Sequence, residues 1–207
     1  LIKSLGIDRF GVLTLIWVVV GYFSLFDIGL GRTLTKLVAE NIGKGQEKKI
    51  PSLIGTALML MGGVSLVGVI LLLFLTPWLV NPILNIPGFL RYEASVVFYI
   101  LAFSIPIVIT TTGLRGILEA YQRFDIVNAI RIPMGLFTFL GPLAVLPFSK
   151  SLVAVVSVLV LGRMIACIVH LICCFFILPR LKKDIDIERS LIRPMISFGG
   201  WLTVSNI

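Results

Sequence analysis

The stretch from Phe10 to Glu40, which decides the fold, reads FGVLTLIWVVVGYFSLFDIGLGRTLTKLVAE. Nearly all of its residues before Asp27 are apolar, and further charges begin just beyond a Gly-Leu-Gly step. About 20 apolar residues suffice for a helix to cross the ~30 Å hydrocarbon core of a bilayer. The stretch therefore predicts a transmembrane helix over residues 10–30, whose cytoplasmic end is polar and is made bendable by two glycines.

The composition of the whole chain agrees with a membrane protein. Of its 207 residues, 58% are hydrophobic and 14% are charged, and the mean hydropathy is +1.08. A soluble domain carries roughly 25% charged residues. The net charge of +8 does not indicate a nucleic-acid partner, because we expect the basic residues to lie in short loops between apolar segments, where anionic headgroups of membrane lipids account for them.

Long apolar runs recur along the chain and predict an all-α, polytopic transmembrane helical bundle. Such runs are too long for strands, and backbone groups in hydrocarbon must be paired internally, which favours helices. We expect complete spans and then a truncated one, over residues 10–30, 52–80, 94–118, 126–148, 151–178 and from about 196. Because the sequence starts at Leu1 and stops inside an apolar run, we expect it to be a fragment of a longer protein.

Basic residues are divided unequally between the two ends of these spans. Four lie at one end: Lys3, Arg9, Arg91 and Lys150. Thirteen lie at the other: Arg32, Lys36, Lys44, Lys48, Lys49, Arg115, Arg123, Arg131, Arg180, Lys182, Lys183, Arg189 and Arg193. Cytoplasmic loops carry the excess of Lys and Arg. We therefore expect the segments around Lys44, Arg123 and Lys182 to face the cytoplasm.

Arg163 is the basic residue that falls in the middle of a predicted span. A central Arg costs ~3 kcal/mol on insertion, which the surrounding Leu, Ile and Val residues offset, but its side chain must then meet protein or water. His170 follows after seven residues, at nearly the same azimuth of a helix, and Cys167 and Cys174 share that face. Arg163 and His170 are candidate binding residues. The structural alternatives are an ion pair for the arginine and a packed, hydrogen-bonded histidine.

Asp27 lies one turn inside the cytoplasmic end of the first span. An acid at this place can bind Na⁺ or a proton, as coupling sites in secondary transporters do, or it can pair with a cation at the membrane edge. Arg32, Arg115 and Arg131 all fall at cytoplasmic ends, where topology alone accounts for arginine. Their functional interpretation is a cationic mouth that attracts a phosphorylated lipid, because guanidinium groups bind phosphate bidentately.

No motif in the sequence indicates catalysis. Cys167, Cys173 and Cys174 lie in one apolar run without the spacing of a disulfide framework or of a metal site. Phosphate-binding loops and nucleophile motifs are lacking. We expect no catalytic residue, no metal and no cofactor, and a protein that is not an enzyme.

Two segments carry a resemblance to a known family: FDIGLGR at Phe26–Arg32 and RGILEAYQRFD at Arg115–Asp125. They resemble the polysaccharide-export family of O-antigen flippases, within the multidrug/oligosaccharidyl-lipid/polysaccharide exporter superfamily. The resemblance covers essentially the whole chain. It implies the N-terminal half of a two-bundle transporter in the cell inner (plasma) membrane, with most of the first helix missing.

The same resemblance implies a cargo and a mechanism. The cargo would be an undecaprenyl-diphosphate-linked oligosaccharide, moved by alternating access, with Na⁺ or H⁺ as coupling cation and with Arg32, Arg115 and Arg163 as candidates for a cationic cavity. A multidrug antiporter of the same superfamily would favour an acidic cavity instead. A membrane-embedded polysaccharide ligase or polymerase would need large outer loops, which are short in this chain. A scaffold that transports nothing is a further alternative.

Overall fold

The computed structural model describes residues 6–22, 29–84, 86–182 and 186–204, and in these parts of the chain it is helical without strands. The long elements are α2 (Ile7–Tyr22), α3 (Leu30–Gly43), α4 (Ile50–Trp78), α5 (Arg91–Ala120), α6 (Phe124–Val145), α7 (Leu152–Ile177) and α8 (Arg189–Val204). Short helical turns join them: η2 (Glu47–Lys49), the π-turn η3 (Leu79–Ile83), η4 (Gly88–Leu90) and η5 (Pro179–Lys182). The predicted all-α class is confirmed.

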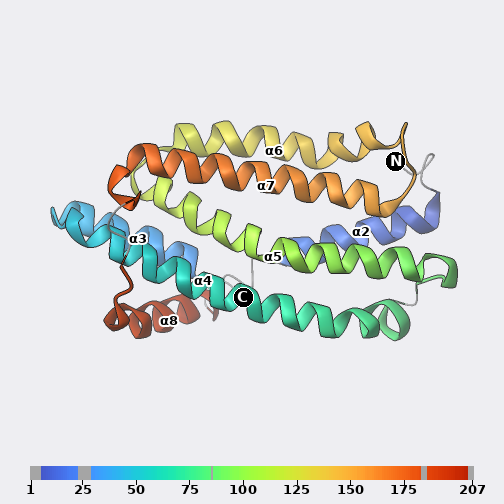
Figure 1. The fold of residues 1–207 in the computed structure, drawn as a ribbon, viewed down its shortest axis with the longest axis horizontal. Coiled ribbons are helices and arrows are strands. Elements are labelled where there is room, and N and C mark those ends of the chain that lie inside the picture. The colour runs from blue at the N-terminus through green and yellow to red at the C-terminus, as the bar shows by residue number, and fades with distance from the viewer. Residues whose placement is uncertain (1–5, 23–28, 85, 183–185, 205–207) are drawn as a thin grey trace.

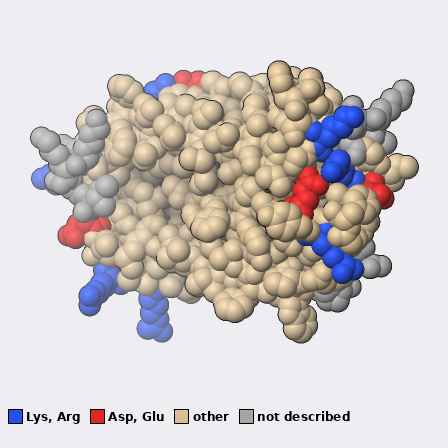
Figure 2. Space-filling model, turned by 45° about the vertical axis from the view of Figure 1, so that its right-hand side comes forward, with Lys and Arg blue, Asp and Glu red and all other residues tan. Residues whose placement is uncertain are grey.

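Helical segments long and apolar enough to cross a membrane cover Glu47–Asn81, Gly88–Ala120, Phe124–Val145 and Leu152–Ile177. They overlap the spans expected over 52–80, 94–118, 126–148 and 151–178. The first expected span, over residues 10–30, contains α2 and a segment outside the described residues. Figure 2 shows charged side chains gathered towards the two ends of the visible face, with an uncharged belt between them. This distribution is that of a protein embedded in a bilayer.

Helix α5 lies at the centre of the bundle (Figure 1) and packs most extensively against α7 and α4, and also against α3. Its buried side chains include Phe98, Leu101, Ile105 and Ile117. Pro106 interrupts the hydrogen-bond ladder inside α5, and Figure 1 shows the helix bending near its middle. The central helix thus has two halves of different direction, each with its own neighbours.

Three connections lie together at one end of the bundle in Figure 1, the left-hand end. They join α3 to α4, α5 to α6 and α7 to α8, and they include the segments around Lys44, Arg123 and Lys182. The shared location agrees with the expectation from the charge asymmetry. We call this end the basic end, and its assignment to the cytoplasm stays a prediction.

The opposite end is held together by the carboxylate of Glu93 on α5. One of its oxygens accepts hydrogen bonds from the hydroxyl of Ser151 (2.8 Å) and the backbone N–H of Leu152 (2.6 Å), at the start of α7. Its other oxygen lies 3.4 Å from Nε of Arg9 on α2. A carboxylate at a helix N-terminus is favourable because it meets unpaired N–H groups and the positive end of the helix dipole. Glu93 therefore ties α2, α5 and α7 together at the end remote from the basic end.

Helix α3 corrects the expectation that the basic residues after the first span lie in a loop. Gly29 has φ +65°, a left-handed conformation that suits glycine, and a new helix begins at Leu30. Leu30, Leu34 and Val38 recur every four residues and are buried. The charged side chains of this stretch lie on its other face, so it is an amphipathic helix that packs against α5 and α4.

The contact between α3 and α5 depends on a small residue. A Cβ atom added at Gly116 on α5 would lie 2.6 Å from Oγ1 of Thr35 and 2.9 Å from the carbonyl oxygen of Gly31. The second of these atoms belongs to the backbone and cannot rotate away. Small residues commonly let membrane helices approach this closely.

Gly116→Ala is expected to destabilise the full-length protein by ~1–3 kcal/mol, because the new methyl group forces α3 away from α5. Thermal unfolding in detergent, followed by the loss of monodisperse protein on size exclusion, measures the effect. Gly63→Ala on α4 is the matched control, since a Cβ there meets nothing within 4 Å. Equal unfolding temperatures for the two variants would show that the helices tolerate the methyl group.

Candidate functional site

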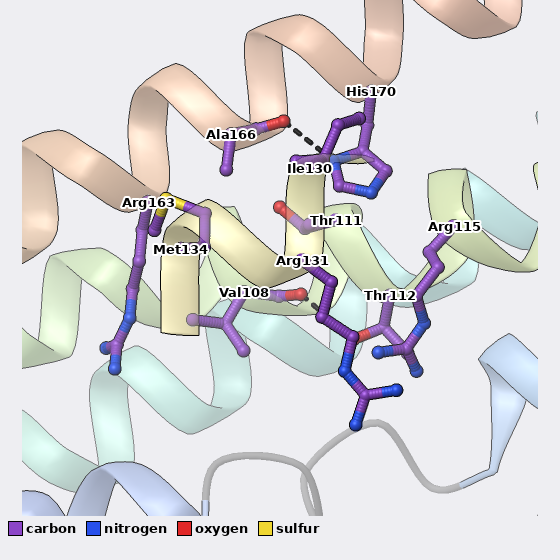
Figure 3. A pocket seen from close by; sticks show the side chains of 10 residues that line it. All are labelled: Val108, Thr111, Thr112, Arg115, Ile130, Arg131, Met134, Arg163, Ala166 and His170. Carbon is purple, nitrogen blue, oxygen red and sulfur yellow. Dashed lines mark hydrogen bonds between the residues drawn. The ribbon is translucent and has the colours of Figure 1, made fainter. Parts of the chain in front are cut away.

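A cavity of about 220 Å³ lies between α5, α6 and α7. Figure 3 shows its lining residues, which are Val108, Thr111, Thr112, Arg115, Ile130, Arg131, Met134, Arg163, Ala166 and His170. Three arginines and one histidine therefore converge from three different helices. None of the described residues that line the cavity is acidic, so the site carries a local excess of positive charge.

The arginines lie at different depths below the basic end. A helix rises ~1.5 Å per residue, which places Arg115 ~8 Å from the end of α5, Arg131 ~10 Å from the start of α6 and Arg163 ~21 Å from the end of α7. These three helix termini all lie at the basic end in Figure 1. The cationic groups thus form a series that runs from near that end towards the middle of the span.

Arg163 is the deepest cation of the series. Its side chain is partly buried, and no described residue forms an ion pair with it. Its neighbour Gly162 packs directly against the Phe137 ring of α6, where an added Cβ would collide with ring carbons. The tight α6–α7 contact beside Arg163 fixes the position at which its side chain leaves the helix. A guanidinium held at this depth without a carboxylate partner is suited to binding an anion.

Arg115 and Arg131 complete the cationic lining nearer the basic end. Nε of Arg115 lies 3.3 Å from Oε1 of Glu119, one turn further along α5, but the two atoms do not form a hydrogen bond and this Nε has no other partner among the described residues. Glu119 therefore balances the charge of Arg115 without occupying its donors. Arg131 is exposed on α6 and forms no ion pair with a described residue.

His170 is almost fully buried, with 5% of its surface exposed. Its Nδ1 lies 2.7 Å from the carbonyl oxygen of Ala166, four residues earlier on α7. A carbonyl oxygen can only accept, so Nδ1 carries the proton of this hydrogen bond. Nε2 is buried and has no hydrogen-bond partner among the described residues. Buried polar atoms are normally paired, so an unpaired atom at a cavity wall suggests a ligand contact.

The structure brings together three of the side chains proposed from the sequence, namely Arg163, Arg115 and His170. Arg32 lies elsewhere, exposed on α3 and outside the cavity lining. Asp27, the proposed ion-coupling residue, lies outside the described residues. The roles of all five stay predictions.

Three polar lining residues, besides the apolar ones, are not identified as cavity residues by the sequence. Arg131 is predicted only at the cationic mouth, because it falls close to a helix end where topology already accounts for arginine. Thr111 and Thr112 follow Pro106 in the sequence, and hydroxyl groups near a proline are readily explained by the carbonyl groups that the proline leaves unpaired. A helical wheel of α6 offers a signal for Arg131, which lies close to the stripe of Val127, Ile130 and Met134 that turns towards the bundle.

A polytopic helical bundle whose described spans enclose a cavity lined by three arginines defines an α-helical integral membrane protein. Comparison with known proteins gives the family. The chain matches the family described as "Polysaccharide biosynthesis protein" over residues 1–207, and it belongs to that family. It is also 31% identical, over 209 aligned residues, to a Shigella flexneri protein named "Putative O-antigen transporter".

That alignment includes 100% of this chain and 48% of the Shigella protein, so the chain spans about half the length of its relative. No solved structure matches the chain. The family and the apolar helices together place the chain in a multi-pass protein of the inner membrane. The resemblance found in the sequence is thereby confirmed at the level of the family.

Proposed function

We propose that this chain is the N-terminal bundle of a flippase that moves a lipid-diphosphate-linked oligosaccharide across the cytoplasmic membrane. The observation that carries the proposal is the cluster of Arg115, Arg131 and Arg163 around one cavity without an acidic lining residue. A diphosphate carries at least two negative charges and cannot enter hydrocarbon unpaired. Guanidinium groups inside the span would replace its hydration through charge-assisted hydrogen bonds.

The sign of the cavity separates this function from its closest competitor. An exporter of cationic drugs needs carboxylates in its cavity, whereas three guanidinium groups would repel a cation. The family relationship to polysaccharide biosynthesis and the name of the Shigella relative both support a saccharide cargo. Transport does not require bond chemistry in the protein, so we propose a transporter rather than an enzyme.

Alternating access is the proposed mechanism, and two features support it. The cationic cavity lies towards the basic end, while Glu93 ties α2, α5 and α7 together at the other end. This arrangement supports a conformation that receives cargo from the basic end. The bend at Pro106 divides α5 between the two regions and offers a hinge about which its halves can move.

Arg163→Ala in the full-length protein is expected to abolish most export, since a charge-assisted hydrogen bond contributes ~1.5–3 kcal/mol, or roughly 10- to 100-fold in affinity. Arg163→Lys should impair export to a similar degree, because lysine lacks the planar fork that binds phosphate bidentately. The measurement is surface polysaccharide in a flippase-deleted host complemented with each variant at equal membrane abundance.

Arg123→Ala serves as the matched control for that experiment. Arg123 also lies at the basic end, but it is exposed, pairs with Asp125 at 2.9 Å and does not line the cavity. Its removal changes the net charge by the same amount and should leave export near the unmutated level. If Arg163→Ala restores surface polysaccharide fully, the diphosphate-binding role of Arg163 is wrong.

Asp27 is proposed to couple transport to an inward gradient of Na⁺ or H⁺. The proposal rests on the sequence, in which an acid precedes a Gly-Leu-Gly step where a loosened helix can expose carbonyl ligands. Asp27→Asn should reduce transport in proteoliposomes that carry a cation gradient, without reducing the amount of protein. Transport that is unchanged in this variant, with and without the gradient, would rule the role out.

A further inference from the structure

The cavity walls differ in the kind of hydrogen bond they can make. Figure 3 shows the guanidinium groups of Arg115, Arg131 and Arg163 on one side, and the imidazole of His170 with the hydroxyl of Thr111 on the other. Guanidinium groups only donate hydrogen bonds. The donors of this wall are suited to an anion, whereas the second wall carries a ring nitrogen and a hydroxyl group.

His170 offers an acceptor to the cavity. Its Nδ1–H donates to the carbonyl oxygen of Ala166 at 2.7 Å, so a neutral ring carries a bare lone pair at Nε2. The residue is 95% buried, and Nε2 has no partner among the described residues. A phosphate oxygen, itself an acceptor, leaves this lone pair unpaired. A ligand group with an O–H or N–H bond would satisfy it.

The two threonines that line the cavity have the same character. The hydroxyl of Thr111 donates to the carbonyl oxygen of Ile107 at 2.6 Å, and that of Thr112 donates to the carbonyl oxygen of Val108 at 3.0 Å. Each hydroxyl has one proton, which is committed to its own helix. What each oxygen presents to a ligand is therefore its lone pairs. Thr111 lies on the side of His170 in Figure 3, and these two residues form a wall that accepts hydrogen bonds.

We propose that this cavity binds the junction between the diphosphate and the first sugar of the cargo, and that His170 selects for a hydroxyl or amide N–H on that sugar. The inference rests on the proposed function. The arginines hold the phosphate oxygens, while Nε2 of His170 and the hydroxyl oxygen of Thr111 accept from the sugar. The cavity, at about 220 Å³, is smaller than the ~300–1,000 Å³ of sites that enclose a whole drug-sized ligand, as suits one section of a long cargo.

Two probes of equal charge separate the contributions of the walls: the methyl ester of undecaprenyl diphosphate, and undecaprenyl diphosphate bearing one N-acetylglucosamine in place of the methyl group. Their dissociation constants are measured on the full-length protein in nanodiscs. The unmutated protein should bind the glycosylated lipid about three- to tenfold more tightly, the effect of one or two neutral hydrogen bonds. Each phosphate of either probe has one ionised oxygen and no P–O–H group, so the two probes carry the same charge and a preference between them reports on the sugar.

His170→Leu should reduce the ratio of the two affinities towards one, because leucine accepts no hydrogen bond. His170→Gln should keep part of the preference, since its amide oxygen accepts. Ile172→Ala, an exposed position on the same helix outside the cavity lining, is the control and should keep the full preference. If the leucine variant does not accumulate in the membrane, His170→Phe takes its place, with a flat ring that has no acceptor.

The outcomes distinguish the two levels of the proposal. If the unmutated protein binds neither lipid, the diphosphate function itself is wrong. If it binds both lipids equally, or if the leucine or phenylalanine variant keeps the preference, the cationic site stands and the sugar-selecting role of His170 is overturned.

Discussion

A guanidinium group in the hydrocarbon of a bilayer needs polar groups or water in contact with it, and this constraint governs the arrangement around Arg163. The side chain leaves α7 near the middle of its span, so α5 and α6 must enclose a polar space beside it. They do so with Thr111, Thr112 and Arg131, and the close contact of Gly162 with Phe137 holds α6 and α7 together at that level. Arg115 and Arg131 therefore line the same cavity as Arg163, which has no carboxylate partner among the described residues. Such an arrangement is unfavourable for an empty protein and favourable for one that binds an anion.

Helix α5 connects the two ends of the bundle and contributes a charged residue to each. At one end Glu93 joins the start of α7 and Arg9 of α2, and at the other end Arg115 contributes to the cationic cavity. Pro106 lies between them. Movement of either half of α5 therefore changes one end relative to the other. The described helices have the Glu93 contact, the bend at Pro106 and the cationic cavity, and the proposed alternating access would use all three.

The features that depend on local pattern can be predicted from the sequence. Apolar runs of membrane length predict the helical class, and the 3.6-residue period alone places Arg163 and His170 on one face. The same patterns assign the stretch after Gly29 to a loop, because the apolar positions of α3 are sparse. They are recognised as one buried face of a helix only once the packing of α3 against α5 is known. Arg131 is predicted at a helix end, where topology already explains a cation, rather than in the cavity. The Glu93 contacts join residues far apart in sequence, and no local pattern indicates them.

A structure of the full-length protein with a lipid-diphosphate-linked saccharide in nanodiscs tests the central claim most directly. The account predicts phosphate oxygens within ~3 Å of the guanidinium nitrogens of Arg163 and of at least one of Arg115 and Arg131. A diphosphate bound elsewhere, with the space between α5, α6 and α7 filled by protein side chains or acyl chains, would contradict it.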